Sequence, residues 1–315
     1  MCLSTKILIG VCTYGRPVML AKCLDSLAKQ SDSAGLSLSI VVVDNESEEN
    51  NRVIVETFRE QCRFPVQYRH EPRRGIAFAR NAILEEAVTT GVDWVAMLDD
   101  DETADPNWIE ALMAPEYLDT PVLMGRQVFV YPEQMPFWTK PKPIVRSRDI
   151  EGIEWNRAST NNVRFSISLV TAGLRFREDL ALTSGEDTDF FARAHVQGFG
   201  IRLTTRAVTF EEAHPDRHTL TGHIYRSYWQ SASEIRLQFT IKPTGQVYRE
   251  NAYRIPLAWL TGLGRLLISP FYVIGGTNKM KRRIVSATKR LGSAAGLSAG
   301  LLGIQTEPYR KISGY

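Results

Sequence analysis

The stretch WVAMLDDDE, residues 94–102, is the most informative segment of the sequence, because an apolar run ends abruptly in four acidic residues. Such a run is typical of a buried strand in a parallel sheet, and these sheets bind ligands beyond the carboxyl ends of their strands. The four carboxylates repel one another, and a divalent cation would offset that repulsion. In extended backbone Asp99 and Asp101 face the same way and Asp100 faces elsewhere, so we expect Asp99 and Asp101 to converge on Mg²⁺ or Mn²⁺. The alternative is a solvated acidic turn before a helix that Asp105 caps.

Strand-like and helix-like patterns alternate on the N-terminal side of this stretch. Short apolar runs at 7–11, 38–43 and 66–69 predict strands, and helical periodicity predicts helices that begin at Pro17 and Gly75. Strands that alternate with helices imply crossover connections and a parallel sheet with helices on both faces. We therefore predict an α/β fold, in which the polar residues just after each strand are the candidates for chemistry.

The C-terminal side has a less regular pattern. Strands are predicted at 128–131 and 163–170, and helices at 187–196 and 219–240. The first of these helices begins within GEDTD, residues 185–189, where acidic side chains suit the positive end of the helix dipole. A capped helix is one interpretation of this segment. A general base for group transfer to a hydroxyl is the other, and the acidic cluster upstream favours it.

The net charge of +3 is unevenly distributed along the 315 residues. Residues 251–304 carry eight Lys or Arg and no Asp or Glu, whereas the rest of the chain has 30 basic and 35 acidic side chains. A slightly acidic body with a basic, apolar tail does not resemble a DNA-binding protein, so we expect no nucleic-acid partner. The combination is typical of a domain that meets an anionic membrane surface.

The tail has two apolar segments, 256–276 and 291–304, on either side of the basic segment 279–290. The first is near the length of a membrane span but is interrupted by glycines and prolines, and the second is too short to span. We expect interfacial or re-entrant helices that the basic residues hold at a membrane. The alternative is a C-terminal helical hairpin that packs on the protein itself.

Composition and cysteine positions favour a globular, cytosolic protein. Apolar residues make up 43% and charged residues 23% of the chain, which is enough to bury a sizeable core. The four cysteines, Cys2, Cys12, Cys23 and Cys62, form no C-x-x-C pair, which argues against a zinc ribbon or a disulfide framework. The N-terminus has no apolar core of a signal peptide, so we do not expect export.

Five segments occur in the order seen in family-2 glycosyltransferases: 11–17 (VCTYGRP), 43–45 (VDN), 75–81 (GIAFARN), 98–102 (LDDDE) and 185–189 (GEDTD). The resemblance covers about residues 5–220, and the chain is similar to the branch that builds bacterial exopolysaccharides, the succinoglycan-type β-glucosyltransferases. It implies a GT-A fold, with a mixed central sheet and helices on both faces.

The resemblance also implies an organisation of the chain. The GT-A domain would occupy 1–250, with a nucleotide-sugar half at about 1–130 and an acceptor half at about 131–250. Residues 251–315 lie outside the resemblance, and their apolar and basic segments predict a helical tail that associates with a membrane.

The resemblance assigns roles to residues in these segments. The residues implied to bind the nucleotide-sugar are Thr13, Tyr14, Arg16, Asp44, Arg80, Asn81, Asp99 and Asp100. The metal ligands implied are Asp101 and Asp99, with His214 as the expected histidine, and the catalytic base is Asp187, with Glu186 beside it. Alternatives remain open: Tyr14 covers the end of the sheet, Asp44 caps the next helix through an Asx turn, Arg80 pairs with a nearby acid, and His214 is a surface histidine.

The implied reaction is an inverting transfer of a sugar, with glucose expected, from a UDP-sugar to a hydroxyl of a polyprenyl-diphosphate-linked oligosaccharide. It would take place at the cytoplasmic face of the bacterial inner membrane, with the protein peripheral or monotopic. The cofactor would be Mn²⁺ or Mg²⁺, which would neutralise charge on the UDP leaving group. Two other classes remain open: a sugar nucleotidyltransferase, and a non-catalytic sugar-binding protein on the same fold.

Overall fold

The structure is a computed structural model, and it describes residues 4–31, 35–133, 135–139, 143–145, 149–183, 185–213 and 218–304. Its strands are β1 (Thr5–Thr13), β2 (Leu36–Asp44), β3 (Val66–His70), β4 (Trp94–Asp99), β5 (Glu102–Ala104), β6 (Val122–Val130), β7 (Glu154–Trp155), β8 (Asn162–Ser166) and β9 (Ile201–Glu212). They form one sheet in the order β3-β2-β1-β4-β8-β6-β9-β5, with β7 paired to β9. The sheet is mixed, because β1 is parallel to β2 and β4 whereas β8 is antiparallel to β4 and β6.

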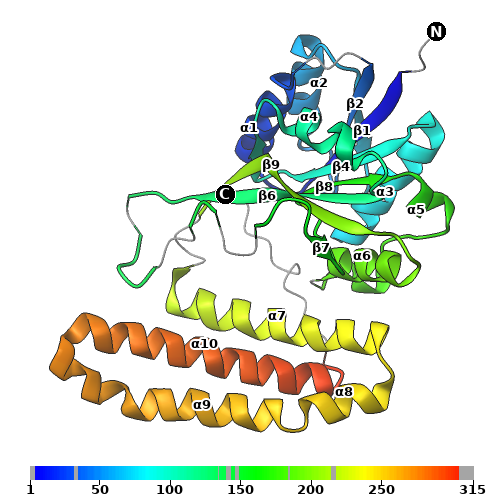
Figure 1. Cartoon of the computed structure of the whole chain (residues 1–315). Coiled ribbons are helices and arrows are strands. Elements are labelled where there is room, and N and C mark those ends of the chain that lie inside the picture. The colour runs from blue at the N-terminus through cyan, green and yellow to red at the C-terminus, as the bar shows by residue number, and fades with distance from the viewer. Residues whose placement is uncertain are drawn as a thin grey trace.

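Helices cover both faces of this sheet (Figure 1). The helices of the α/β body are α1 (Pro17–Ala28), α2 (Arg52–Gln61), α3 (Ile76–Thr90), α4 (Trp108–Leu112), α5 (Ser168–Thr171) and α6 (Glu186–Val196), with 3₁₀ turns η1 (Pro115–Tyr117) and η2 (Glu178–Leu180). One core packs α1, α2 and α4 on the sheet through residues such as Leu20, Val55 and Trp108. The other packs α3 and α6 through residues such as Ile83 and Phe190. The predicted α/β sheet with helices on both faces is confirmed.

Three long helices form a separate layer beside the body (Figure 1). The elements of this helical layer are α7 (Leu220–Ile241), α8 (Thr244–Asn251), α9 (Arg254–Ile268), η4 (Ser269–Gly275) and α10 (Thr277–Leu301). α7 lies nearest to the body, α10 lies between α7 and α9, and α9 is farthest from the sheet. The helical hairpin that the sequence left as an alternative is therefore present, and it packs on α7.

A row of glycines holds α10 close to α7. An added Cβ would lie 2.7 Å from the Ile224 carbonyl oxygen at Gly292 and 2.0 Å from the Tyr228 carbonyl oxygen at Gly296. Gly300 continues the row, at 2.8 Å from the next turn of α7. Backbones can approach this closely only where no side chain intervenes, so the glycines of 291–304 are packing residues. Their common order along both helices means that α7 and α10 run in the same direction (Figure 1).

The outer side of α9 is apolar and exposed. Ala258 and Gly262 are buried, whereas Leu260 is 68% and Leu267 is 74% exposed on the opposite side of the helix. By length and composition, Thr244–Gly275 is the one helical stretch among the described residues that could cross a membrane, and only 17% of its apolar window is buried. In the structure this stretch is divided into α8, α9 and η4, and α9 lies along α10.

Several predicted elements differ from those observed. The predicted strand at 163–170 ends at Ser166 and continues into α5, and the predicted strand at 128–131 is the end of the longer β6. The expected helix capped by Asp105 is wrong, because β5 precedes this position and α4 begins only at Trp108. Asp105 instead closes a turn, in which its Oδ1 accepts a hydrogen bond from the Asn107 N–H at 3.0 Å.

Candidate active site

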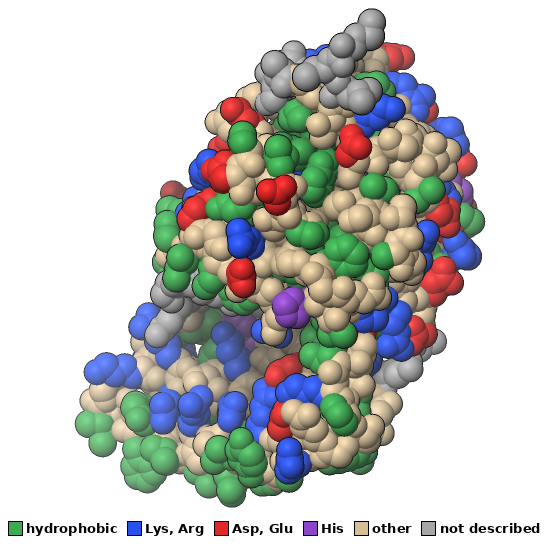
Figure 2. Space-filling view, turned by 45° about the vertical axis from the view of Figure 1, so that its right-hand side comes forward, with side chains coloured by type: hydrophobic (Ala, Val, Ile, Leu, Met, Phe, Trp, Pro, Cys, Tyr) green, Lys and Arg blue, Asp and Glu red, His purple; other side chains and the backbone are tan. Residues whose placement is uncertain are grey.

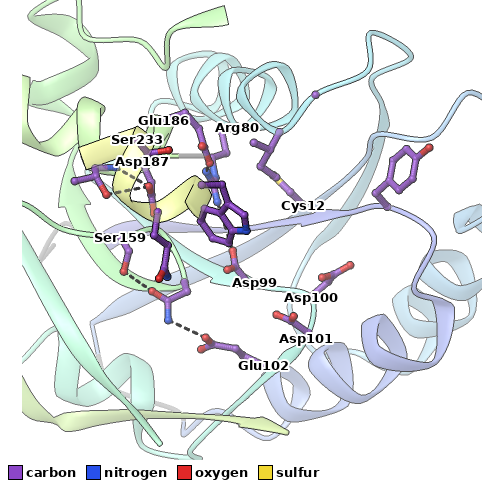
Figure 3. A pocket seen from close by; sticks show the side chains of 18 of the residues that line it. Cys12, Arg80, Asp99, Asp100, Asp101, Glu102, Ser159, Glu186, Asp187 and Ser233 are labelled. Carbon is purple, nitrogen blue, oxygen red and sulfur yellow. Dashed lines mark hydrogen bonds and ion pairs between the residues drawn. The ribbon is translucent and has the colours of Figure 1, made fainter. Parts of the chain in front are cut away.

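A cavity of about 860 Å³ opens between the carboxyl ends of β1 and β4, the first turn of α6, and α7. Its lining brings together most of the residues predicted from the sequence, and Figure 3 shows the carboxylates around it. The predicted residues that line it are Thr13, Tyr14, Arg16, Arg80, Asp99, Asp100, Asp101, Glu186 and Asp187. The two acidic segments, 86 positions apart between Asp101 and Asp187, therefore face one space.

The acidic turn after β4 is tied to the loop after β1. Thr13 Oγ1 donates a hydrogen bond to Asp100 Oδ2 at 2.8 Å. Arg16 Nη1 donates to Asp100 Oδ1 at 3.1 Å and to Asp101 Oδ2 at 3.0 Å. The expectation that Asp100 faces away from the site is therefore wrong, because Asp99, Asp100 and Asp101 all line the cavity, whereas the convergence of Asp99 and Asp101 on a cation stays a prediction. The chain turns directly after Asp99, so strand alternation no longer applies, and Arg16 joins Asp100 to Asp101.

Arg80 of α3 connects the acidic turn to the start of α6. Its guanidinium forms an ion pair with Glu186 and lies 3.7 Å from Asp99 Oδ1. It also lies over the Phe176 ring, 5.7 Å from the centroid. The predicted alternative, in which Arg80 pairs with a nearby acid, is thus observed while the residue still lines the cavity. Arg80 fixes the distance between the two acidic segments.

Three carboxylates of the cavity, those of Asp99, Asp100 and Glu186, have a raised pKa and hold protons more tightly than free side chains do. Burial raises the pKa of Asp100 to about 7, with Asp101 adding repulsion and Arg16 opposing it. Burial also raises the pKa of Asp99 to about 6, where the nearby charges of Asp101 and Asp187 contribute and Arg80 opposes. Glu186, only 2% exposed, has a pKa raised to about 7 by burial, although Arg80 favours its charged form. One oxygen of Glu186, Oε2, is buried without a hydrogen-bond partner in the described structure.

Asp187 lies at the first turn of α6 and faces the cavity (Figure 3). Its Oδ1 accepts hydrogen bonds from the Thr188 N–H at 2.6 Å and the Thr188 hydroxyl at 3.2 Å. The preceding Gly185 has a φ of 91°, a left-handed conformation that glycine adopts readily. A hydrogen-bonded, half-exposed carboxylate at a helix N-terminus is held in place and remains accessible to a substrate hydroxyl.

Two predicted residues have structural surroundings instead. Asp44 is fully buried, and it accepts hydrogen bonds from the Asn51 N–H at 3.1 Å and the Tyr68 hydroxyl at 3.0 Å. It closes the loop before α2, as the Asx-turn alternative predicts, and it is not among the cavity-lining residues. Asn81 exchanges two hydrogen bonds of 2.9 Å with the Phe176 backbone, so it holds α3 rather than facing the cavity. The predicted His214 lies outside the described residues.

The sequence did not reveal two parts of the lining. Gln127 Nε2 donates to Glu102 Oε1 at 2.5 Å and to Glu211 Oε2 at 2.6 Å, and Asn161 Nδ2 donates to Glu102 Oε1 at 2.8 Å. The second part is one face of α7, which contributes Gly222, Tyr225, Arg226, Trp229, Gln230, Ser233, Glu234 and Leu237. The spacing of three or four residues between many of these positions is a helical stripe that the sequence displays, but nothing local indicates what it faces.

The acidic turn fits a divalent cation that is completed by a substrate. The described residues contain no group of three or more His, Cys, Asp or Glu side chains that would hold a metal ion by themselves. Mg²⁺ is commonly held by one or two carboxylates together with substrate phosphates, so a complete protein site is not required. Asp99 and Asp101 both line the cavity, and they would supply these carboxylates.

Comparison with known proteins identifies the family. A family model described as glycosyl transferase family 2 matches residues 8–175, which is more than half of the chain. The chain belongs to glycosyl transferase family 2. The matched residues contain four of the five segments that carry the resemblance, from the loop after β1 to the acidic turn after β4.

Two relatives are similar to the chain in sequence over most of its length. The chain is 32% identical over 261 residues to the succinoglycan biosynthesis protein ExoM of Rhizobium meliloti, covering 80% of this chain and 78% of that protein. It is 28% identical over 253 residues to the glucosyl-dolichyl phosphate glucuronosyltransferase of Haloferax volcanii, covering 73% and 76%.

The solved structures establish the fold. TarS 1-349 of S. aureus, in complex with UDP-GlcNAc, superposes with a TM-score of 0.55 at 15% identity, covering 95% of this chain and 92% of that one. The mannosyltransferase PcManGT of Pyrobaculum calidifontis, in complex with GDP-Man and Mn²⁺, has a TM-score of 0.53 at 18% identity, covering 90% and 86%. The GT-A fold expected of a family-2 glycosyltransferase is confirmed.

Proposed function

We propose that this family-2 glycosyltransferase transfers a sugar, with glucose as the expected one, from a UDP-sugar to a hydroxyl of a lipid-linked oligosaccharide in bacterial exopolysaccharide synthesis. The observation that carries the proposal is the single cavity that the acidic turn and Asp187 share. Two similar proteins support the proposal. ExoM is named as a succinoglycan biosynthesis protein, which supports a role in exopolysaccharide synthesis, and TarS binds UDP-GlcNAc, which supports a UDP-sugar donor.

The loop after β1 offers a place for the nucleotide base. Tyr14 and Arg74 both line the cavity, and the Arg74 guanidinium lies 5.6 Å from the centroid of the Tyr14 ring. A flat base stacks favourably on an aromatic ring and on a guanidinium plane. We therefore place the uracil at Tyr14, which leaves the diphosphate near Arg16 and the acidic turn.

Asp187 supplies the proton acceptor of the reaction. It takes the proton from the acceptor hydroxyl as that oxygen attacks the anomeric carbon from the face opposite UDP. The new glycosidic C–O bond forms while the bond from the anomeric carbon to the diphosphate oxygen breaks, so the configuration inverts and UDP leaves with the electron pair. Glu186, fixed by Arg80, is the positioning residue beside the base.

The cation that we propose for Asp99 and Asp101 is Mn²⁺ or Mg²⁺. When bound there, it would supply Lewis-acid stabilisation of charge on the UDP leaving group. The turn that Arg16 and Thr13 hold keeps Asp101 at the cavity before any donor binds.

The helical layer is proposed to lie on the cytoplasmic face of the inner membrane. Leu260 and Leu267 are exposed on α9, and α9 is the helix of this layer that lies farthest from the body (Figure 1). The basic residues of 279–290 lie on the same layer, where they would meet anionic headgroups. This arrangement favours a helix that lies in the interface plane over one that spans the bilayer.

Donor profiling tests the proposed function. Purified full-length protein is incubated with a panel of UDP-sugars and Mn²⁺, and UDP release and product mass are measured. Release from one UDP-sugar, dependent on the metal, is the expected result. Pyrophosphate release from UTP would instead identify a nucleotidyltransferase, and no turnover with any donor would leave a non-catalytic sugar-binding protein.

A further inference from the structure

A second polar cluster lines the cavity where β5 pairs with β9. Glu102 at the start of β5 is the register partner of Glu211 on β9, and Gln127 lies on β6, which pairs with the other side of β9. All three residues line the cavity (Figure 2 shows the hollow between the body and the helical layer). Like charges directly opposite each other on neighbouring strands are destabilising. The needs of the sheet alone therefore do not account for two glutamates at this position.

Amide groups hold both glutamates in place. Gln127 Nε2 donates to Glu102 Oε1 at 2.5 Å and to Glu211 Oε2 at 2.6 Å, and so uses both of its N–H bonds. Asn161 Nδ2 donates to the same Glu102 Oε1 at 2.8 Å, and Asn161 Oδ1 accepts a hydrogen bond from the Ser159 hydroxyl. Figure 3 shows this line of hydrogen bonds from Ser159 to Glu102. The Glu102 carboxyl is thus fixed through one of its two oxygens.

The other oxygen of Glu102 lacks a partner. Glu102 is 1% exposed, and its Oε2 is buried with no partner of hydrogen-bond geometry among the described residues. Figure 3 shows this side chain at the cavity beside the acidic turn. A buried polar atom without a partner destabilises a protein, and nearly all such atoms are paired. An unpaired oxygen at the wall of a cavity therefore points to a ligand that completes its hydrogen bonding.

A hydroxyl group suits this oxygen better than an anionic group does. Burial, with the charge of Asp99 as the next cause, raises the pKa of Glu102 well above its ordinary value. Oε2 donates a hydrogen bond when the carboxyl is protonated and accepts one when it is charged. A sugar hydroxyl can pair with it in either state, because a hydroxyl is both a donor and an acceptor. A phosphate would instead be repelled by the neighbouring carboxylates.

We propose that Glu102, held by Gln127 and Asn161, binds a hydroxyl of the sugar that is transferred. The inference rests on the proposed function and names the residue that selects the donor sugar. A site built to hydrogen-bond one hydroxyl rejects an analogue that lacks it, because the buried group of the protein is then left unpaired. The cluster is therefore a specificity determinant and takes no part in the proton transfer.

The position of Glu102 favours the donor sugar over the acceptor. Glu102 directly follows Asp101, and the charge of Asp99 acts on it. The cation proposed for these two aspartates would hold the diphosphate to which the transferred sugar is bonded. That sugar lies between the diphosphate and Asp187 in the proposed reaction. We therefore place its hydroxyls at the part of the cavity that Glu102 and Ser159 line.

Calorimetry on the full-length protein with Mn²⁺ tests the proposal without turnover. The probe is the one of UDP-glucose, UDP-galactose and UDP-GlcNAc that wild type binds most tightly, and UDP is the reference ligand. Glu102→Ala is expected to weaken binding of the UDP-sugar about tenfold, because one hydrogen bond is lost, while the affinity for UDP changes less than about twofold. Glu102→Gln keeps a hydrogen-bonding group at both oxygen positions and should retain most of the affinity.

The matched control is Glu86→Ala on α3. Glu86 is 8% exposed and accepts a hydrogen bond from the Gln67 amide at 3.0 Å, but it is not among the cavity-lining residues. This variant also removes a buried carboxylate that a glutamine amide holds. Its affinity for both ligands is expected to equal that of wild type.

Analogues of the same UDP-sugar that each lack one hydroxyl identify the group that Glu102 binds. Wild type should bind one of these analogues about tenfold more weakly than the parent, and Glu102→Ala should bind that analogue and the parent equally. Wild type that binds every analogue as tightly as the parent would overturn the proposal, and this measurement needs no variant to fold.

Two other results would also overturn the proposal. Equal losses of affinity for UDP and for the UDP-sugar in Glu102→Ala would assign Glu102 to the cation or the nucleotide. An unchanged affinity for the UDP-sugar, together with a raised acceptor KM, would assign it to the acceptor. Wild type that binds neither UDP nor any UDP-sugar would contradict the proposed function itself, so the two failures are distinguishable.

Discussion

The α/β body and the helical layer use glycine and charge in opposite ways. In the body, glycines such as Gly75 and Gly185 adopt positive φ at the starts of helices, and acidic residues converge on a cavity. In the layer, Gly292 and Gly296 lie within a regular helix and bring two backbones together, while the charge of residues 251–304 is entirely basic. The body holds the carboxylates in place around the cavity. The layer supplies one wall of that cavity through α7 and exposes the apolar side of α9.

Asp187→Asn gives the largest effect we expect in the body. Loss of the proton acceptor should slow transfer by about 10²–10⁴-fold, while UDP binding measured by calorimetry stays unchanged. Asp25→Asn, an exposed aspartate on α1, is the control with normal turnover. Normal transfer by Asp187→Asn would remove Asp187 from its role and leave the cavity without an assigned base.

Membrane binding gives the corresponding test of the layer. Leu260→Asp combined with Leu267→Asp removes two exposed leucines of α9, and burial of a leucine contributes about 1.5–3 kcal/mol. The double variant should bind phosphatidylglycerol vesicles about 10²-fold more weakly in a flotation assay or worse. The matched control is Val53→Asp with Val196→Asp, which are 73% and 71% exposed on the body. Equal losses in both double variants would show that α9 has no special role at the bilayer.

Two glycine substitutions compare a packed position of the helical layer, Gly296, with an open one, Gly264. Gly296→Ala places a Cβ 2.0 Å from the Tyr228 carbonyl oxygen, so the helices must separate, at a cost of about 1–3 kcal/mol in the free energy of unfolding. Gly264→Ala in α9 meets no atom within 4 Å, and it should stabilise the protein by about 0.5–1 kcal/mol. Chemical denaturation measures both. Similar changes for the two variants would contradict the close approach of α7 and α10.

The smallest expected effect is a pH dependence of stability in the body. Glu186 has a folded-state pKa of about 7, above its ordinary value of 4.5, so the folded protein retains a proton that the unfolded chain releases. Its contribution to the free energy of unfolding therefore falls as pH rises from about 4.5 to about 7, and then levels off. Glu186→Gln should reduce that slope in EDTA, leaving the part that Asp99 and Asp100 cause, whereas Glu110→Gln, on the exposed side of α4, should retain all of it. An unchanged slope in Glu186→Gln would show that other carboxylates cause it.

The sequence predicted the body better than the layer, because the relevant signals are local in the body. Apolar runs followed by polar residues identified β1 and β4, and GEDTD marked the start of α6. β9, by contrast, alternates poorly because threonines and arginines interrupt it, and it was not predicted. The sequence showed 291–304 only as an apolar segment too short to span a membrane, since only the position of α7 shows that its glycines are contacts.

Within the candidate site, the sequence predicted which residues lie near the cavity more reliably than it predicted their hydrogen-bond partners. Asp44 and Asn81 lie in segments that carry the family resemblance, but their hydrogen bonds go to Asn51 and Phe176. Asn51 is seven positions from Asp44, whereas Phe176 is 95 positions from Asn81, and a distant partner is fixed only by the tertiary fold. The role of Arg80 as a bridge between Asp99 and Glu186 depends on the same long-range arrangement.

The position of α7 between cavity and glycine row has a mechanical consequence. Because Gly296 touches the backbone of α7, α10 cannot shift or tilt without moving the helix that carries Trp229 and Ser233. A displacement of α9 and α10 would thus be transmitted through α7 to the residues that line the cavity. For the same reason, a chain shortened at residue 250 would lose the support that α10 gives to α7, although Asp99, Asp101 and Asp187 would still be present.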